Sequence, residues 1–132
     1  MKVSDILAKK GSAVISISPG TAVIDVLKLM DEKNIGSVVV LDNGTYCGIV
    51  TERDYSRKVI LKGKNSTDTV VADIMTTDLP AVAPTDTIDH CMTLMSNKHI
   101  RYLPVFANNA LAGIISMSDV VGAKMKRQQE TI

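Results

Sequence analysis

The sequence predicts an α/β (α+β) fold of two β-α-β-β-α repeats, related by a pseudo-twofold axis, with small sheets packed against helices. One observation is that a long segment occurs twice at a spacing of 65 residues, so that Asp54 matches Asp119. A second is that both copies carry apolar residues at helical spacing, and a third is a β-branched run typical of a buried strand. Two copies are too few for a solenoid. The repeat therefore predicts a pair of equivalent units.

Each copy begins with a short apolar run followed by a turn and a helix. The run at 13–17 predicts a strand, whereas its counterpart at 79–83 contains Pro80 and predicts an edge strand or an extended, loop-like segment. Thr21 and Asp86 occupy equivalent positions after the turns and suit the N-cap of the helix. Apolar residues then recur at offsets 0, 3, 4 and 7 of an amphipathic helix: Val23, Val26, Leu27 and Met30, and again Ile88, Cys91, Met92 and Met95.

A hairpin and a second helix complete each copy. The continuous β-branched run at 38–41 predicts a strand buried on both faces. Asn and Gly at 42–44, and Asn at 107–109, predict hairpin turns with positive φ. The returning strands are expected at 46–50 and 111–115, and the second helices near Thr51 and Ser116.

The repeats set the expected boundaries along the chain. We expect a first repeat with its lead-in at 1–62, a polar linker at 63–70, a second repeat at 71–127 and a fraying tail at 128–132. The segments 3–7 and 71–75 are related lead-ins, but they lie 68 residues apart. The spacing of the lead-ins exceeds the 65-residue spacing of the repeats by three residues, and we assign this difference to the linker.

Composition restricts the function classes. The chain has 132 residues, 45% of them hydrophobic, and a net charge of +1, which suits one compact domain. Near-neutral charge predicts no strong attraction to nucleic acid or anionic membranes. The sequence also has no apolar run of the roughly 18 residues that a membrane span needs. We therefore expect no nucleic-acid or membrane partner, and a cytoplasmic location.

The two cysteines and two histidines predict no chemical centre. Cys47 and Cys91 form no CxxC pair and have no metal-ligand spacing to a histidine. Both are expected as small buried residues, with a reactive thiol as the alternative. No Ser-His-Asp set, phosphate loop or GxGxxG is present. We expect no catalytic residues, no metal and no enzymatic activity; the third hypothesis, after the two given below, is a nucleotide hydrolase.

One repeated pattern can carry chemistry: Gly, two apolar residues, Ser or Thr, two further residues and Asp. Thr51 with Asp54, and Ser116 with Asp119, match a capping box, which is a purely structural device. The same strand-to-helix turn can also attract phosphate with its free N–H groups. A carboxylate there can accept two vicinal ribose hydroxyls, as in dinucleotide folds. Both alternatives remain open at this point.

Basic residues make the two copies unequal. The first copy adds Arg53, Arg57 and Lys58, which suit phosphate but also suit a solvated basic face. The positions matching Arg57 and Lys58 are Gly122 and Ala123 in the second copy. We expect the two sites to differ in affinity.

The doubled motif, with His99 to Val105 and the segment 73–76 (Asp-Ile-Met-Thr), resembles a pair of cystathionine β-synthase (CBS) domains, a Bateman module. The resemblance covers about residues 3–124 and is closest to stand-alone two-domain members. It implies two clefts between the repeats that bind adenosine-containing ligands such as AMP, ATP or NAD(H). It implies no required cofactor.

The resemblance also implies site residues. Asp54 and Asp119 would hold ribose hydroxyls; Ser118 departs from the glycine common in close relatives. The ribose and phosphate set comprises Thr51, Arg53, Asp54, Arg57, Lys58, His99, Arg101, Ser116, Ser118 and Asp119. The adenine and cleft set comprises Val14, Ile15, Gly36, Ser37, Ala81, Val82, Ile100, Tyr102 and Pro104.

The leading hypothesis is a regulatory module that senses energy or redox state and modulates a partner. Such modules pair as homodimers through their helices, here the methionine-bearing helices at 23–30 and 88–95; alternatively, those methionines only fill the core. The second hypothesis is a ligand-independent adaptor for a partner such as thioredoxin.

Overall fold

The computed structural model describes residues 1–11 and 13–130, with side chains through residue 128. The chain forms two compact units. The first unit is the continuous segment Val14–Asp78. The second combines Met1–Ala13 with Leu79–Ile132. Each unit is described by itself.

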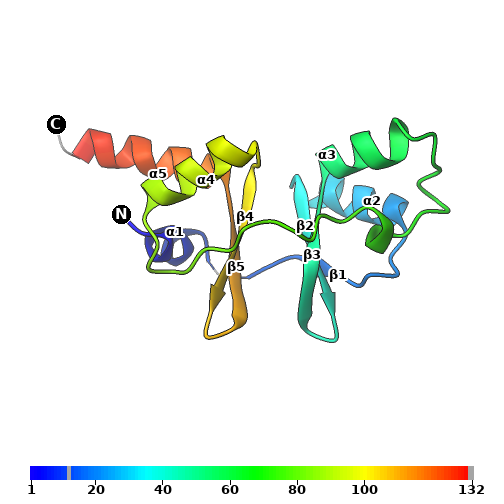
Figure 1. Ribbon diagram of the computed structural model, residues 1–132, viewed down its shortest axis with the longest axis horizontal. Coiled ribbons are helices and arrows are strands. Elements are labelled where there is room, and N and C mark those ends of the chain that lie inside the picture. Colours follow the sequence, from blue (N-terminus) through cyan, green and yellow to red (C-terminus); the bar gives the residue numbers. More distant parts are fainter. Residues whose placement is uncertain (12, 131–132) are drawn as a thin grey trace. The chain divides into compact units, whose positions relative to one another are not determined.

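The first unit is a three-stranded sheet with helices packed on one face (Figure 1). Strand β1 pairs in parallel with β2, and β2 pairs in antiparallel with β3. Its apolar core is formed by the helices, the sheet and the 3₁₀ turn η2. The elements are β1 (Ser16–Ile17), α2 (Val23–Lys33), β2 (Ser37–Asp42), β3 (Thr45–Thr51), α3 (Glu52–Tyr55), the π-helix η1 (Ser56–Ile60) and η2 (Val71–Asp73).

The second unit repeats this plan with one strand reduced. Strands β4 and β5 form an antiparallel pair, and Val82 adds a single parallel bridge to Val105 where β1 lies in the first unit. The segment at 79–83 is thus extended and loop-like, one of the two predicted alternatives. The helices lie on one face of the pair (Figure 1). The elements are α1 (Val3–Lys10), α4 (Ile88–Lys98), β4 (Tyr102–Ala107), β5 (Ala110–Ser116) and α5 (Met117–Glu130).

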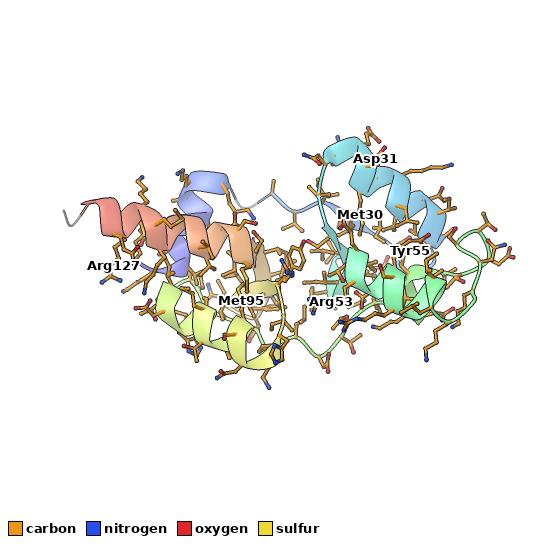
Figure 2. The ribbon with its side chains drawn as sticks, turned by 90° about the horizontal axis from the view of Figure 1, so that it is seen from above. Met30, Asp31, Arg53, Tyr55, Met95 and Arg127 are labelled. Carbon is orange, nitrogen blue, oxygen red and sulfur yellow. The ribbon has the colours of Figure 1, made fainter. Side chains whose placement is uncertain are left out.

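The mixed α and β architecture and both helical stripes are confirmed. On α2, Val23 and Val26 are fully buried, and on α4, Cys91 is fully buried. The methionines on these stripes fill cores, since Met30 is 4% and Met95 1% exposed (Figure 2). These two methionines are therefore not available as an adaptable interface surface.

Both hairpins form as predicted. Asn43 and Gly44 have φ of 51° and 83°, and Asn108 and Asn109 have φ of 53° and 64°. Positive φ at both central residues matches the right-handed twist of the strands. Each hairpin carries a register shift before its turn, and the extra residue in the first is Cys47. Such a bulge leaves one residue unpaired.

The predicted N-caps are wrong by one residue. The Thr21 hydroxyl bonds to Ser18 Oγ at 3.1 Å, and Asp86 Oδ2 accepts a bond from Ala83 N at 2.7 Å, so both side chains close the preceding turns. The observed caps are Ala22 for α2 and Thr87 for α4.

The linker replaces the missing side-chain cap of α2. Val23 N donates to Thr69 O at 2.8 Å, and Ile24 N donates to Ser66 O at 3.0 Å. Helix termini need such partners because their first N–H groups have none within the helix. The linker is therefore docked on the first unit.

The lead-ins pack away from the repeats that follow them. Helix α1 belongs to the unit of the second repeat, and residues 71–76 belong to the unit of the first. The compact units thus differ in composition from the segments 1–62 and 71–127, because the two lead-ins are exchanged. Helix α5 continues through Glu130, so part of the expected tail is helical, and residues 131–132 lie outside the described part.

The cysteines differ from each other. Cys91 is buried, as predicted, and burial raises its pKa to about 11. Cys47, the extra residue of the bulge, packs against the first core but is only half-buried, and this part of the prediction is wrong. Among the described residues, no helix combines the length and apolar character needed to cross a bilayer.

Candidate functional site

In the first unit, three separate segments meet at one end of the sheet. Val39 N donates to Ile15 O at 3.1 Å, which ties the β1 side to β2. Glu52 N donates to Gly36 O at 3.2 Å, which ties the start of β2 to the start of α3. Ser37 is paired with Thr51 in the sheet register, so the motif hydroxyl lies beside the start of the middle strand.

The second unit assembles the same junction. Val82 N donates to Pro104 O at 3.0 Å, and Met117 N donates to Arg101 O at 2.8 Å. Tyr102 is paired with Ser116 in the register. Ile15, Gly36, Ser37 and Thr51 of one unit, and Val82, Arg101, Tyr102 and Ser116 of the other, are therefore joined at equivalent junctions within their own units.

Several predicted residues have further structural roles. Pro104 is buried within β4, and Ile100 packs against the second core. His99 ends α4 in the left-handed conformation, with φ of 54°. Arg57, Arg101 and Ser118 are exposed.

Figure 2 shows that Tyr55 and Arg53 lie on different sides of α3. Tyr55 lies on the side that faces α2, where it packs against the first core, and Arg53 lies on the side away from α2. The exposed Arg53 is therefore carried on the solvent side of α3.

Asp54 forms the predicted capping box and also bonds to residues outside it. Thr51 N donates to Asp54 Oδ2 at 2.9 Å, and Asp54 N donates to Thr51 Oγ1 at 3.1 Å. The Thr51 hydroxyl also bonds to Oδ2 at 3.1 Å. The other oxygen, Oδ1, accepts from Thr76 Oγ1 at 2.8 Å and from Lys58 Nζ at 2.9 Å. The carboxylate is thus held by its own turn, its own helical segment and the exchanged lead-in.

Asp119 forms the second capping box. Ser116 N donates to Asp119 Oδ2 at 2.8 Å, and Asp119 N donates to Ser116 Oγ at 3.1 Å. Lys10 Nζ, from α1, pairs with the same Oδ2 at 2.8 Å. Burial raises the pKa of Asp119, but the Lys10 ammonium and the Ser116 donors outweigh it and hold the pKa below its ordinary value.

The two units place a lysine in the same way from different elements. Lys58 Nζ bonds to Ile74 O at 2.9 Å as well as to Asp54. Lys10 Nζ bonds to Ile114 O at 2.9 Å as well as to Asp119. Each motif carboxylate is therefore neutralised by one ammonium that also binds a backbone carbonyl.

Sequence reasoning missed two residues of these networks. Lys10 lies 109 residues from Asp119 and carries no local signal. Thr76 was part of a recognised segment, but its bond to Asp54 depends on the exchange of lead-ins.

The described residues show no metal centre, and a hollow lies in the first unit. In the part of the chain that the structure describes, no three His, Cys, Asp or Glu side chains gather closely enough to hold a metal ion. The hollow, of about 330 Å³, lies at the end of α2. It is lined by Leu27, Met30, Asp31, Asn34, Ile35, Gly36 and Glu52.

The fold and site define a tandem α/β module with a doubled Ser/Thr-x-x-Asp turn, and comparisons with known proteins give its family. A CBS domain family model matches residues 3–60 and 71–126. The chain is 34% identical to the CBS domain-containing protein CBSX3, mitochondrial, of Arabidopsis thaliana, over 98% of this chain and 68% of that protein. The protein belongs to the CBS-domain family and contains a pair of CBS domains.

Solved structures of CBS-domain proteins have the same fold as this chain. A CBS-domain protein from Burkholderia ambifaria MC40-6 is 40% identical, with a TM-score of 0.93 over 97% of this chain and 96% of that chain. A hexameric CBS-CP12 protein from bloom-forming cyanobacteria is 31% identical, with a TM-score of 0.78 over 92% of this chain and 69% of that chain.

Proposed function

We propose that this CBS pair is a regulatory module that binds an adenosine nucleotide, such as AMP, ATP or NAD(H), and modulates a protein partner according to energy or redox state. The doubled turn carries the proposal, because it sets a lysine-paired carboxylate beside the first residues of a middle strand in each unit. A carboxylate there suits ribose hydroxyls, by analogy with dinucleotide folds.

Nearby groups suit the rest of a nucleotide. The exposed guanidinium groups of Arg57 and Arg101 suit phosphate, which arginine binds in bidentate fashion. Ile15 is 37% exposed next to its unit's sheet end and offers apolar surface to adenine. Regulation requires that the nucleotide bind two states of the protein differently, with coupling of about 1–3 kcal/mol in typical cases.

A thermal-shift panel with AMP, ADP, ATP, NAD, NADH and S-adenosylmethionine tests the proposal. At about a hundred times Kd, binding to the folded state alone adds about 2.7 kcal/mol, or several degrees of melting temperature. A selective shift supports nucleotide sensing, and no shift at millimolar ligand contradicts it. Prolonged incubation should leave the nucleotides intact, because the module is proposed to bind rather than to turn over its ligand.

We also propose a homodimer. Ile60 at the end of η1 and Met125 within α5 occupy equivalent positions and are each 56% exposed, and Leu61 is 76% exposed. Exposed apolar side chains of this kind suit association, and the related CBS-CP12 protein is hexameric. Light scattering that returns the 14.2 kDa monomer mass at micromolar concentration would contradict the dimer.

A ligand-independent adaptor is the second candidate, favoured by the hollow at the end of α2. Its lining combines the apolar side chain of Leu27 with the carboxylates of Asp31 and Glu52. This combination suits a basic side chain of a partner, thioredoxin being one redox protein to test. A pulldown of thioredoxin with this protein would favour the adaptor if its yield does not change when nucleotide is added and falls in the Glu52→Lys variant.

A further inference from the structure

The hollow of the first unit offers negative charge beside apolar surface. It has a volume of about 330 Å³ and lies where the end of α2 meets the start of α3. Its lining includes the apolar side chain of Leu27 and the carboxylates of Asp31 and Glu52. Both acidic residues are exposed to solvent. Such a lining suits a lysine, whose stem is apolar and whose head is positively charged.

Residues 60–64, at the end of η1, form a tip with the opposite charge. Leu61 is 76% exposed and Ile60 is 56% exposed. Lys62 and Lys64 follow them and are also exposed. Apolar side chains that gather on a surface with a polar rim mark interaction sites. The tip is therefore a candidate contact surface with a positive rim.

One helical segment connects the hollow to the tip, because η1 continues α3 without a break (Figure 1). Glu52 and Ser56 lie four residues apart, on the same side of the segment, and the Ser56 hydroxyl donates to Glu52 O at 3.1 Å. Ile60 follows Ser56 within one i→i+5 turn of the π-helix. All three residues are exposed. They form an exposed stripe that leads from the hollow to the tip.

Two further cations of the segment lie beside this stripe. Arg53 lies on the side of α3 away from α2 (Figure 2), whereas α2 lines the hollow. Arg57 follows Arg53 by four residues and therefore shares its side of the segment. Along the stripe itself, the charge changes from negative at the hollow to positive at the tip.

A surface with opposite charges at its two ends is complementary to a second copy that is turned end for end. In such an antiparallel pair, the tip of each copy meets the hollow of the other. The contact occurs twice because a twofold axis relates the copies. A parallel pair would set hollow against hollow and tip against tip, and like charges placed together weaken an interface.

We propose that two copies of this chain associate through their first units in antiparallel orientation, with Leu61 and Lys62 of each copy received by the hollow of the other. Lys62 then faces Asp31 and Glu52, and Leu61 faces Leu27. This inference rests on the proposed homodimer and adds its interface and its orientation. It gives the hollow an occupant from the protein itself, whereas the adaptor hypothesis requires an outside partner.

Charge-swapped variants of the full chain test the orientation, with the dimer Kd measured by analytical ultracentrifugation. Glu52→Lys and Lys62→Glu should each raise the Kd about tenfold, because each replaces two attractive contacts by two repulsive ones. The double variant, and an equimolar mixture of the two single variants, should recover most of the lost affinity. Lys126→Glu, at an exposed position of α5, makes the same change in net charge as Lys62→Glu and should leave the Kd unchanged.

Two outcomes of the charge swap would overturn the proposal. A Kd unchanged in both single variants would contradict the antiparallel orientation, since a parallel pair already sets like charges together. Weakening that neither the double variant nor the mixture restores would contradict the contact between Glu52 and Lys62.

Ile60→Ser and Met125→Ser separate the two units as sites of association. The two positions are equivalent and equally exposed, so neither substitution removes core packing. Ile60→Ser should raise the dimer Kd, because Ile60 lies on the stripe, and Met125→Ser should leave it unchanged. A rise in Kd with Met125→Ser alone would place the interface in the second unit and overturn this inference, while the homodimer stands.

The proposed homodimer can fail separately from this interface. A wild-type chain that sediments as a monomer at micromolar concentration would overturn both. If that monomer also captures purified thioredoxin, and Glu52→Lys abolishes the capture, the hollow belongs to an outside partner and not to a second copy.

Discussion

Gly48 and Gly113 occupy equivalent positions in their repeats, and each leaves room for an exchanged lead-in. A Cβ on Gly48 would lie 2.6 Å from Thr76 O, and a Cβ on Gly113 would lie 2.8 Å from Leu7 Cδ2. One neighbour is backbone, whereas the other is the end of a flexible side chain. The same glycine therefore meets obstacles of different stiffness in the two units.

Gly48→Ala should destabilise the protein more than Gly113→Ala. The Thr76 carbonyl is fixed by its residue's pairing with Ile49, so overpacking there should cost about 1–3 kcal/mol or more. Leu7 can change rotamer, so Gly113→Ala should cost less. Urea denaturation of both variants measures the difference, and Gly20→Ala, in open space, is the control. Equal losses would show that the Thr76 backbone yields as readily as Leu7.

Thr76→Val should destabilise the first unit by about 1–3 kcal/mol, because it leaves Asp54 Oδ1 short of one buried bond. Thr77→Val, at an exposed neighbouring position, should change stability little. Guanidinium denaturation compares the two. If Thr76→Val is as stable as the Thr77→Val control, the bond from the Thr76 hydroxyl to Asp54 does not stabilise the packing of the lead-in.

The ion pair of Lys10 with Asp119 should give a pH-dependent contribution to stability. The pKa of Asp119 is lowered in the folded state, so the contribution is present above the ordinary pKa of about 3.9 and is lost as pH falls through the folded-state pKa. Both side chains are partly exposed, so Lys10→Met should cost only about 0.2–1 kcal/mol at neutral pH.

Denaturation of wild type and Lys10→Met as a function of pH checks this. The difference between the two curves should shrink once Asp119 is protonated in both states. Lys9→Met should follow the wild-type curve at every pH. A difference that persists unchanged in acid would assign the effect to packing of the lysine stem.

Cys47 should react with thiol reagents before Cys91. Burial raises the pKa of Cys91 to about 11, so little thiolate forms near neutral pH, and the thiolate is the nucleophile. Cys47 is half-buried at the bulge and more accessible. Peptide mass spectrometry after brief iodoacetamide treatment should find label on Cys47, with both cysteines labelled in the denatured chain. Preferential labelling of Cys91 would contradict the described burial.

The features predicted correctly from sequence are those fixed by nearby residues. The stripe from Val23 to Met30 follows helical period, and the positive φ of Asn43 follows from a short turn between strands. The capping boxes also form within four residues, so Thr51 and Asp54 could be paired without knowledge of the fold.

The features missed depend on distant contacts. Ala22 serves as an N-cap because the carbonyls of Ser66 and Thr69 supply what its side chain lacks. Lys10 reaches Asp119 because α1 packs with the second repeat. No local pattern encodes either arrangement. Cys47 likewise lies at a bulge that sequence alternation does not reveal, and it is only half-buried.

The exchange of lead-ins makes the halves of this gene product interdependent. A protease cut near Gly63 would give one fragment that holds α1 but not the rest of its unit, and another that holds η2 but not the rest of its own. Each fragment would thus lack the lead-in that completes its compact unit, although each contains one full copy of the motif. The two repeats therefore form a reciprocal pair, in which each supplies a lead-in to the compact unit of the other.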